Sequence, residues 1–169
     1  MENGYNIQTT KQVGEYLVAC EVARRGLLVA TFAGNVPDFD IIAIDNSGAS
    51  CPIQVKASRS GSWQFTITKF ANITFDDKRQ IIGTKIDSNI PDLICVFVVT
   101  ADNYGNDLFY IVEWSIAQDI IIKHYSDWLE KHGGIRPKKY DSLHCVIGEQ
   151  DLLEYRDNWS LITKVAKKQ

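Results

Sequence analysis

The stretch VPDFDIIAIDNSGASCPIQVKAS, residues 36–58, decides how the first half of this sequence folds. An apolar run follows Asp40, a polar turn of Asn, Ser and Gly interrupts it, and a second run ends on Gln54-Val55-Lys56. Turn residues between two short apolar runs predict a β-hairpin. Gln54 and Lys56 lie two residues apart, so both side chains project from the same face of the second strand. This polar face has two explanations: a solvated sheet surface or a metal-dependent active site.

The bulk composition is that of an ordinary globular domain. The chain has 169 residues, of which 45% are hydrophobic and 23% charged, so we expect one domain over residues 1–169 with a substantial core. The net charge of −3 gives no overall basic field for a nucleic acid, although a local basic cleft can coexist with it. No apolar run is long enough to span a membrane and the first residues carry no signal sequence, which predicts a cytoplasmic protein without a membrane partner.

The four cysteines are spaced too widely for a metal-binding or redox motif. No CxxC pair is present, and Cys20, Cys95 and Cys145 lie in apolar runs, where a thiol packs as a small hydrophobic group. We therefore expect neither a zinc site nor a disulfide framework in this chain.

A helix is predicted before the hairpin. Thr9 is a suitable N-cap with Gln12 as its capping-box partner, and the helix then extends to about Arg25, before Gly26. Glu15 lies on the edge of the apolar face, near the predicted helix start. The apolar side chains expected in the core are Val13, Leu17, Cys20 and Ala23, with Val18, Ala19 and Val22 widening the stripe.

Seven runs are typical of strands, and their order predicts an α/β sandwich around a central mixed sheet. A long amphipathic helix is expected over residues 115–131 and a helical tail over residues 150–167, while residues 70–89 are expected outside the sheet. The predicted strands span residues 27–32, 40–45, 51–58, 63–68, 93–99, 108–112 and 143–147.

The predicted hairpin can bring together groups that hold a divalent cation. If the turn at residues 46–48 pairs the two strands antiparallel, Asp40 lies opposite the segment from Gln54 to Lys56. Hard cations such as Mg²⁺ take oxygen ligands, and a carboxylate with an amide oxygen provides two of them. Lys56 can then orient or deprotonate an attacking water, and Glu15 adds a second carboxylate if its helix packs against this sheet edge.

Three short motifs in this order resemble the PD-(D/E)XK nuclease superfamily: Gly14-Glu15 on a helix, Pro37-Asp38-Phe39-Asp40 before a strand, and Gln54-Val55-Lys56 on the next strand. The resemblance is strongest to the branch of Holliday-junction resolvases and restriction-like enzymes. It covers a core motif region, residues 9–70, and leaves residues 90–169 as a C-terminal extension of sheet and helices. It implies a restriction-endonuclease-like three-layer sandwich that hydrolyses DNA phosphodiester bonds with Mg²⁺ or Mn²⁺.

The resemblance also assigns roles to individual residues. Asp40 matches the metal-binding aspartate because it directly precedes the apolar strand, whereas Asp38 stands two residues early. Lys56 matches the motif lysine and Glu15 the helix glutamate. Gln54 departs from the usual Asp or Glu, and a neutral ligand holds Mg²⁺ less tightly. Members of the superfamily often work as dimers, so the resemblance allows a homodimer.

Two basic segments are candidate contacts for a DNA backbone. Ser58, Arg59 and Ser60 follow the motif lysine, where backbone and side-chain donors can meet a phosphate, although a simple turn explains them equally well. Arg136 lies in the basic loop GGIRPKK, for which a solvated loop is the plainer explanation.

Each site residue, taken alone, has a structural explanation. Asp40 can accept backbone hydrogen bonds at a strand entry, and Glu15 can favour the positive end of its helix. One alternative function is therefore a catalytically weak or inactive member that binds nucleic acid or protein. Another is an interaction module in the C-terminal half, on a face that would carry Trp114, Trp128 and Trp159.

Overall fold

A five-stranded mixed sheet forms the centre of the protein. The structure is a computed structural model that describes residues 4–32, 38–103 and 105–166, with side chains from Asn6 onward. The strand order is β1-β2-β3-β7-β8, and within it β3 and β7 pair in parallel while the other neighbours are antiparallel. These strands are β1 (Leu28–Thr31), β2 (Ile41–Ile44), β3 (Ser50–Ser58), β7 (Ile94–Val99) and β8 (Leu108–Glu113).

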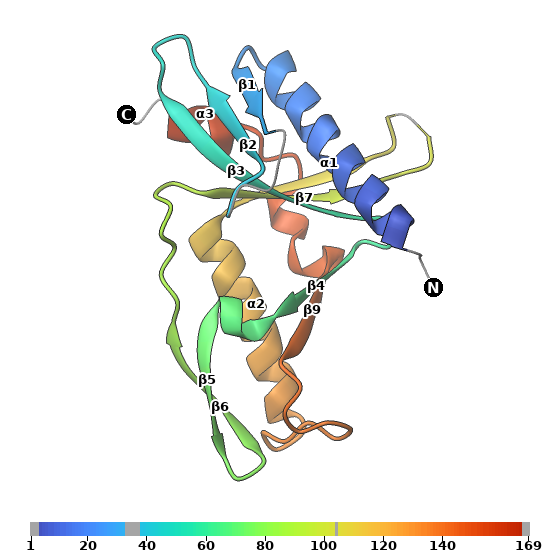
Figure 1. Cartoon of the computed structure of the whole chain (residues 1–169), viewed down its shortest axis with the longest axis vertical. Coiled ribbons are helices and arrows are strands. Elements are labelled where there is room, and N and C mark those ends of the chain that lie inside the picture. The colour runs from blue at the N-terminus through green and yellow to red at the C-terminus, as the bar shows by residue number, and fades with distance from the viewer. Residues whose placement is uncertain (1–3, 33–37, 104, 167–169) are drawn as a thin grey trace.

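Helices cover both faces of this sheet, so the predicted three-layer α/β arrangement is confirmed (Figure 1). Helices α1 (Gly4–Arg24) and α3 (Ser160–Ala166) share one core cluster with the sheet, and α2 (Trp114–Glu130) packs into a second cluster on the opposite face. Neighbouring positions on β7 divide between the clusters, as the alternation of side chains requires. Val96 and Val98 lie in the first cluster, and Cys95 and Phe97 in the second.

Two smaller two-stranded sheets extend the α2 face. Strand β4 (Ser62–Thr66) pairs with β9 (His144–Gly148) and is followed by the 3₁₀ turn η1 (Ile67–Lys69). Strands β5 (Ala71–Asp76) and β6 (Arg79–Lys85) form a hairpin that lies outside the central sheet, as expected for residues 70–89 (Figure 1). The run predicted at 63–68 is thus a strand, but it leaves the main sheet. Its partner is about eighty residues away, so no local pattern indicated the pairing.

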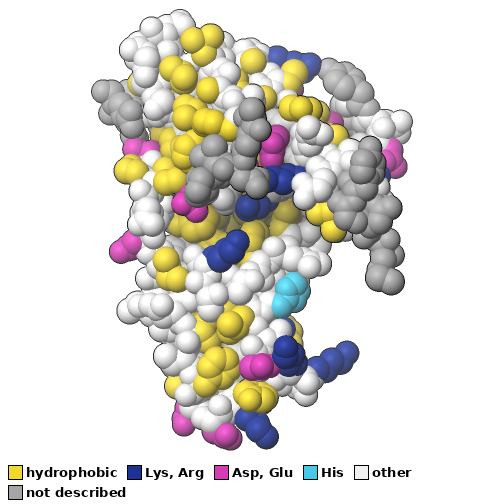
Figure 2. Space-filling view, viewed as in Figure 1, with side chains coloured by type: hydrophobic (Ala, Val, Ile, Leu, Met, Phe, Trp, Pro, Cys, Tyr) yellow, Lys and Arg dark blue, Asp and Glu magenta, His cyan; other side chains and the backbone are white. Residues whose placement is uncertain are grey.

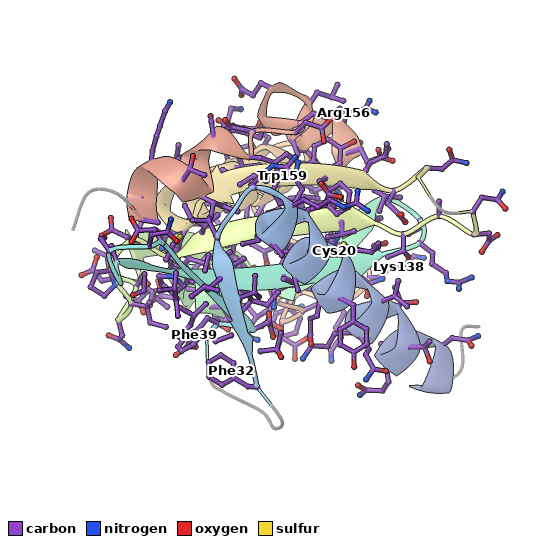
Figure 3. The ribbon with its side chains drawn as sticks, turned by 90° about the horizontal axis from the view of Figure 1, so that it is seen from above. Cys20, Phe32, Phe39, Lys138, Arg156 and Trp159 are labelled. Carbon is purple, nitrogen blue, oxygen red and sulfur yellow. The ribbon has the colours of Figure 1, made fainter. Side chains whose placement is uncertain are left out.

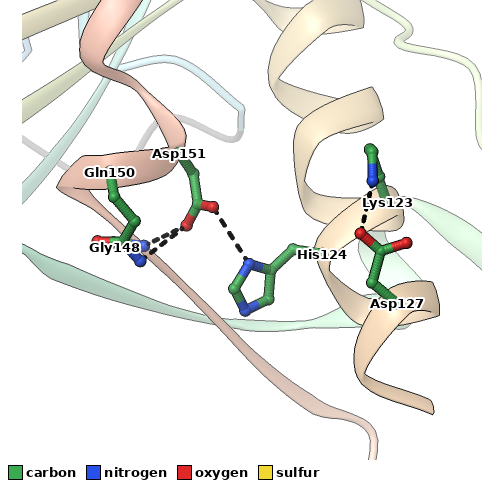
Figure 4. Close-up of polar contacts among 6 residues, drawn as sticks. All are labelled: Lys123, His124, Asp127, Gly148, Gln150 and Asp151. Atoms are coloured by element: carbon green, nitrogen blue, oxygen red, sulfur yellow. Dashed lines mark hydrogen bonds and ion pairs between the residues drawn. The ribbon is translucent and has the colours of Figure 1, made fainter. Parts of the chain in front are cut away.

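Buried polar contacts fix these additions against α2. The side-chain amide of Gln118 donates to the carbonyl oxygens of Phe70 and Ile86, both at 2.7 Å, where the β5–β6 hairpin begins and ends. A second contact holds the β4–β9 ribbon. Asp151 accepts a hydrogen bond from the N–H of Gly148, the last residue of β9, at 2.8 Å, and its carboxylate lies 3.3 Å from Nδ1 of His124 on α2 (Figure 4). The β4–β9 ribbon is therefore held in a defined position relative to the sheet.

The first helix begins earlier and faces the core differently than predicted. It starts at Gly4, so Thr9 lies inside the helix and is not its N-cap. Val18 and Val22 are fully buried, whereas Val13, Cys20 and Ala23 are exposed. The reason is Gly14: an added Cβ there would lie 2.4 Å from the Cβ of Ala57 on β3. The helix approaches the sheet through a residue without a side chain, which a search for apolar positions overlooks.

The predicted helical tail is also wrong in its first half. Residues 149–155 form two 3₁₀ turns, η2 (Glu149–Asp151) and η3 (Leu153–Tyr155), before α3 begins. Asp157 adopts a positive φ of 52° and its N–H donates to the Phe109 carbonyl at 2.9 Å, so the chain is tied to β8 and cannot continue as a helix.

The three tryptophans proposed as one interaction face do not share a face. Trp159 is buried in the core cluster of α1 and α3, while Trp114 and Trp128 pack against the cluster on the α2 side. Cys95 and Cys145 are buried, as predicted for thiols in apolar runs, whereas Cys20, for which the same was predicted, is exposed. Across the described ranges, no helix combines the length and the apolar character needed to cross a membrane.

Candidate active site

The β2–β3 hairpin has the register that the sequence predicts. Ile41 pairs with Ile53, which places Asp40 opposite Gln54 at the open end of the hairpin. The backbone N–H of Asp40 donates to the Ile53 carbonyl, and its carboxylate Oδ2 accepts the N–H of Val55, both at 2.8 Å. One oxygen of Asp40 is thereby fixed to β3, and Oδ1 remains as the oxygen that can face a ligand.

The turn at the far end of the hairpin explains this register. Oδ1 of Asp45 accepts hydrogen bonds from the backbone N–H groups of Ser47 at 2.8 Å and Ala49 at 3.0 Å. Gly48 supplies the positive φ of 89° that such a tight turn needs. A turn with fixed length sets the pairing of every residue back to Asp40.

Asp38 and Phe39 shape the entry to β2. Asp38 has a φ of 74°, a conformation that Asp tolerates better than most residues, and its carbonyl accepts a hydrogen bond from Nε2 of Gln54 at 3.0 Å. This leaves the amide oxygen as the ligand atom that Gln54 can offer. Phe39 packs edge-to-face on Phe32 at the end of β1, with ring centroids 5.4 Å apart (Figure 3). Pro37 of the predicted motif lies outside the described residues.

Helix α1 brings Glu15 to the same place. The close approach of Gly14 to Ala57 seats this turn of the helix directly on β3. The ammonium of Lys11 lies 3.6 Å from Oε1 of Glu15 and 3.7 Å from Oδ1 of Asp40. A single cation therefore already sits between the two carboxylates, which come from a helix and a strand entry that are 25 positions apart in the sequence.

The site perturbs the titration of two of its groups in the directions expected for a functional site. Burial, and next the charge of Asp40, raise the pKa of Glu15, while Lys11 and Lys56 oppose the rise. Burial lowers the pKa of Lys56, with the charge of Asp40 acting in the opposite direction. Two carboxylates thus share a partly dehydrated space with an amine that gives up its proton more readily than a free lysine.

Hydrogen bonding and strand pairing hold the backbone of Lys56 in place. Its carbonyl accepts the indole N–H of buried Trp63 at 2.8 Å, and it pairs in register with Phe97 on β7. Cys95 lines the cavity beside it, and burial raises the pKa of that thiol to about 12, so the thiol stays neutral. The backbone beneath Lys56 is therefore fixed by both packing and hydrogen bonding.

Lys56 lines both a cavity and a neighbouring groove. A cavity of about 550 Å³ is lined by Asp38, Gln54, Lys56, Gln64, Thr66 and His144 among others. A groove of about 520 Å³ on the other side is lined by Thr10, Lys11, Lys56, Ser58, Arg59 and Ser60 among others. Gln64 and Phe65 of β4 also line both, so the ribbon of β4 and β9 borders the site.

The predicted DNA-contacting residues divide into two groups. Ser58, Arg59 and Ser60 line the groove, where Oγ of Ser58 accepts the Ser60 N–H at 3.2 Å and Arg59 pairs with exposed Asp102 at 3.2 Å. Arg136 is not brought to either hollow. Its guanidinium lies 4.6 Å from the ring centre of Trp128 and donates to the His144 carbonyl at 2.7 Å.

The residues that sequence reasoning missed are Lys11 and the outward positions of the β4–β9 ribbon. Lys11 precedes Glu15 by one helical turn, and this spacing is a signal that could have identified it as a neighbour. Gln64, Thr66 and His144 carried no such signal, because their place depends on the distant pairing of β4 with β9.

The donor set suits a hard cation. Two carboxylates and an amide oxygen are the kind of ligands that Mg²⁺ or Mn²⁺ takes, usually with several waters retained. In the described part of the chain no group of three or more His, Cys, Asp or Glu side chains could hold a metal. A site here would therefore depend on Asp40 and Glu15, with Gln54 as a neutral third ligand.

Comparisons with known proteins support the fold. No protein-family model matches the chain, and no curated protein is similar to it in sequence. Among solved structures, the chain is similar to a bacterial homing endonuclease, I-Ssp6803I, with a TM-score of 0.52 and 15% sequence identity. The match covers 96% of this chain and 97% of that chain, so the shared architecture extends well beyond the predicted motif region. At this level of identity, the likeness establishes a common fold.

Proposed function

We propose that this protein is a metal-dependent nuclease that hydrolyses phosphodiester bonds in DNA. The observation that carries the proposal is the convergence of Asp40 and Glu15 on one cation position, beside Gln54 and Lys56. The structural likeness to a homing endonuclease supports the same class of activity. The PD-(D/E)XK resemblance, with glutamine in place of the second acidic residue, belongs to this proposal as well.

Asp40, Glu15 and Gln54 would hold the metal ion. Asp40 would use Oδ1, because Oδ2 is bound to the Val55 N–H. Gln54 would use its amide oxygen, because its nitrogen is bound to Asp38. When bound, Mg²⁺ or Mn²⁺ supplies Lewis acidity and lowers the pKa of a coordinated water.

Lys56 would act on the attacking water and on the phosphate. Because burial lowers the pKa of Lys56, a larger fraction of this amine is neutral at a given pH than for a free lysine. The neutral amine can accept a proton from water, and the charged form can stabilise the negative charge that develops on phosphorus. The fixed backbone of Lys56 keeps the amine within reach of both the attacking water and the phosphate.

The charges around Lys56 are compatible with the approach of a DNA backbone. The charges of Lys11 and Lys69 act on Lys56 together with that of Asp40, so the two carboxylates are accompanied by cations. Figure 2 shows Lys and Arg side chains gathered across the middle of the face it displays, between α1 and the β5–β6 hairpin. A phosphate backbone can approach such a site, since the positive charges offset the carboxylates.

The β4–β9 ribbon is placed to contact the bases. Gln64, Thr66 and His144 are exposed, and Thr66 pairs with His144 across the two strands. The major groove of B-DNA accepts a two-stranded ribbon, and Gln and Thr side chains recognise base edges there. A duplex whose scissile phosphate lies at Lys56 would present its neighbouring base pairs to this ribbon, because all three side chains line the same cavity as Lys56.

A second function is favoured by one observation. Gln54 offers a neutral oxygen where an acidic ligand would bind Mg²⁺ more tightly, and this favours a protein that binds DNA without cutting it. The two functions are separated by incubating labelled duplex, branched and single-stranded DNA with the protein, with Mg²⁺, Mn²⁺ or EDTA. Cleavage that requires metal supports the nuclease. Metal-independent binding with every substrate left intact contradicts the nuclease and supports the binding module.

A further inference from the structure

We propose that Lys11 is an exchangeable counter-ion, whose ammonium neutralises Glu15 and Asp40 until a divalent metal displaces it toward a DNA phosphate in the adjacent groove. This inference rests on the proposed nuclease function, because it assigns the metal to the same two carboxylates. It adds a role for a residue outside the metal-ligand and motif positions.

The atoms involved indicate direct competition. Oδ1 of Asp40 is the oxygen that faces Lys11, at 3.7 Å, and it is also the oxygen left for a metal once Oδ2 is bound to Val55. Glu15 faces Lys11 through Oε1 at 3.6 Å. A divalent ion bound by these oxygens would lie in the space between the two carboxylates that the ammonium occupies now, and closer to each oxygen than the ammonium does. Two cations cannot occupy this position together, so binding of one excludes the other.

The burial of the three side chains identifies which one can move. The Lys11 side chain is 51% exposed, whereas those of Glu15 and Asp40 are 27% and 17% exposed. A half-exposed lysine on a long, flexible stem exchanges partners at little cost. The carboxylates are held by the helix packing and by the hydrogen bond to Val55, so displacement moves Lys11 and leaves the site in place.

The groove beside the site offers Lys11 a new partner. Lys11 itself lines this groove with Ser58, Ser60 and Thr10. Thr10 is buried, and its hydroxyl Oγ1 has no hydrogen-bond partner within the described structure. This hydroxyl exposes too little surface for a phosphate in the groove to contact it. The released ammonium would instead hold a phosphate beside Ser58 and Ser60, which line the same groove.

The test measures metal and DNA binding separately with the whole 169-residue chain. Mn²⁺ affinity of the metal-free protein is measured by calorimetry for wild type, Lys11→Met and Lys69→Met. Lys69 is the matched control, because its charge acts on Lys56 and it lines the cavity beside Lys56, but among the described residues it forms no ion pair with Glu15 or Asp40. We expect Lys11→Met to bind Mn²⁺ about three- to tenfold more tightly, and Lys69→Met to change the affinity less than about twofold.

DNA affinity provides the second readout. We expect the DNA affinity to fall while the Mn²⁺ affinity rises, and a purely structural role of Lys11 would not move the two affinities in opposite directions. In a Lys56→Ala background, where the duplex stays intact, Lys11→Met should weaken duplex binding in Mn²⁺. It should also reduce the slope of log affinity against log salt by about one. Lys11→Gln serves as a second variant and should reproduce both changes.

Several outcomes overturn the inference. Unchanged or weaker Mn²⁺ binding by Lys11→Met and Lys11→Gln contradicts the competition between Lys11 and the metal. If Lys69→Met gains as much Mn²⁺ affinity as Lys11→Met, the effect is a general loss of positive charge and not competition for one position, which also overturns the inference. If wild type cleaves DNA only with metal yet the Lys11 variants bind Mn²⁺ as wild type does, this inference fails alone. If neither wild type nor the variants bind Mn²⁺, the metal site of the proposed function fails with it.

Discussion

The carboxylate of Asp40 is hydrogen-bonded to the backbone of Val55, at 2.8 Å, between the two β3 positions that carry Gln54 and Lys56. This single contact fixes a charged group from one strand beside the polar face of the next. It also decides which oxygen of Asp40 can serve a metal. The hairpin therefore acts as the frame of the candidate site, and α1 adds Glu15 to it.

Replacing Gln54 by an acidic residue tests whether Gln54 is a metal ligand and whether its neutral side chain limits the affinity. Gln54→Glu should bind Mn²⁺ about tenfold more tightly, because a third carboxylate joins the oxygen ligands. It should also lower the free energy of unfolding of the metal-free protein by about 1 kcal/mol, because the hydrogen bond to the Asp38 carbonyl is lost. Calorimetry and urea unfolding measure the two effects. Gln64→Glu adds the same charge to the cavity wall and should change neither the Mn²⁺ affinity nor the free energy of unfolding. An equal gain in Mn²⁺ affinity in Gln64→Glu would contradict the assignment of Gln54 as a metal ligand.

The packing of α1 on β3 should depend on the absence of a side chain at position 14. Gly14→Ala places a Cβ 2.4 Å from that of Ala57, and such overpacking costs about 1–3 kcal/mol. We expect a lower midpoint of urea unfolding and, because Glu15 is carried on the displaced turn, weaker Mn²⁺ binding. Cys20→Ala, at an exposed position of the same helix, should leave both within error. Wild-type stability of Gly14→Ala would show that the helix does not approach the sheet in this way.

Glu15 should lower the stability of the metal-free protein at neutral pH. Burial and Asp40 raise the pKa of Glu15 above its ordinary value of 4.5, so the folded state binds this proton more tightly than the unfolded chain. Stability then falls as pH rises from about 4.5 through the raised pKa, and the loss persists at higher pH.

Glu15→Gln removes this pH-dependent loss. The variant should melt at a higher temperature than wild type at pH 7, and the difference should vanish below pH 4.5. Saturating Mn²⁺ should reverse the order by stabilising wild type. A lower melting temperature of metal-free Glu15→Gln at pH 7 would show that Glu15 stabilises the fold, against this account.

The outward face of the β4–β9 ribbon should determine sequence preference. Gln64→Ala and His144→Ala remove polar side chains that line the cavity beside Lys56. Each should relax the preference for base pairs next to the cleaved bond, by about 1–3 kcal/mol per lost contact, with little change in the salt dependence of binding. Sequencing the products from a randomised duplex library measures this preference. Asn46→Ala, in the exposed β2–β3 turn, is the control, and unchanged preferences in both ribbon variants would exclude base contacts there.

Much of the fold could be predicted from the sequence, because its signals are local. The polar turn around Gly48 and the alternation after Cys51 set the hairpin and its register. The apolar run that contains Cys95 indicated a strand covered on both faces. These features, with the order of elements, were sufficient for a three-layer α/β arrangement with Asp40 opposite Gln54.

The rest depends on contacts that no local pattern encodes. The core face of α1 is set by Gly14, which contributes no apolar side chain to a periodicity. The pairing of β4 with β9 joins distant segments, so Gln64 and His144 could not be placed near Lys56. Lys11 could be placed beside Glu15 by helical spacing, but its distance to Asp40 required the packing of the helix on the sheet.

The most direct test of the central claim is single-turnover cleavage of duplex DNA in Mn²⁺ by Lys56→Ala, beside wild type and Lys69→Ala. Circular dichroism establishes that each variant is folded. Lys56→Ala should lose at least about 100-fold in rate while it still binds Mn²⁺, because it lacks the group that acts on water and phosphate. Lys69→Ala should lose less than about tenfold. Cleavage by Lys56→Ala at the wild-type rate would contradict the assignment of this site as the active centre.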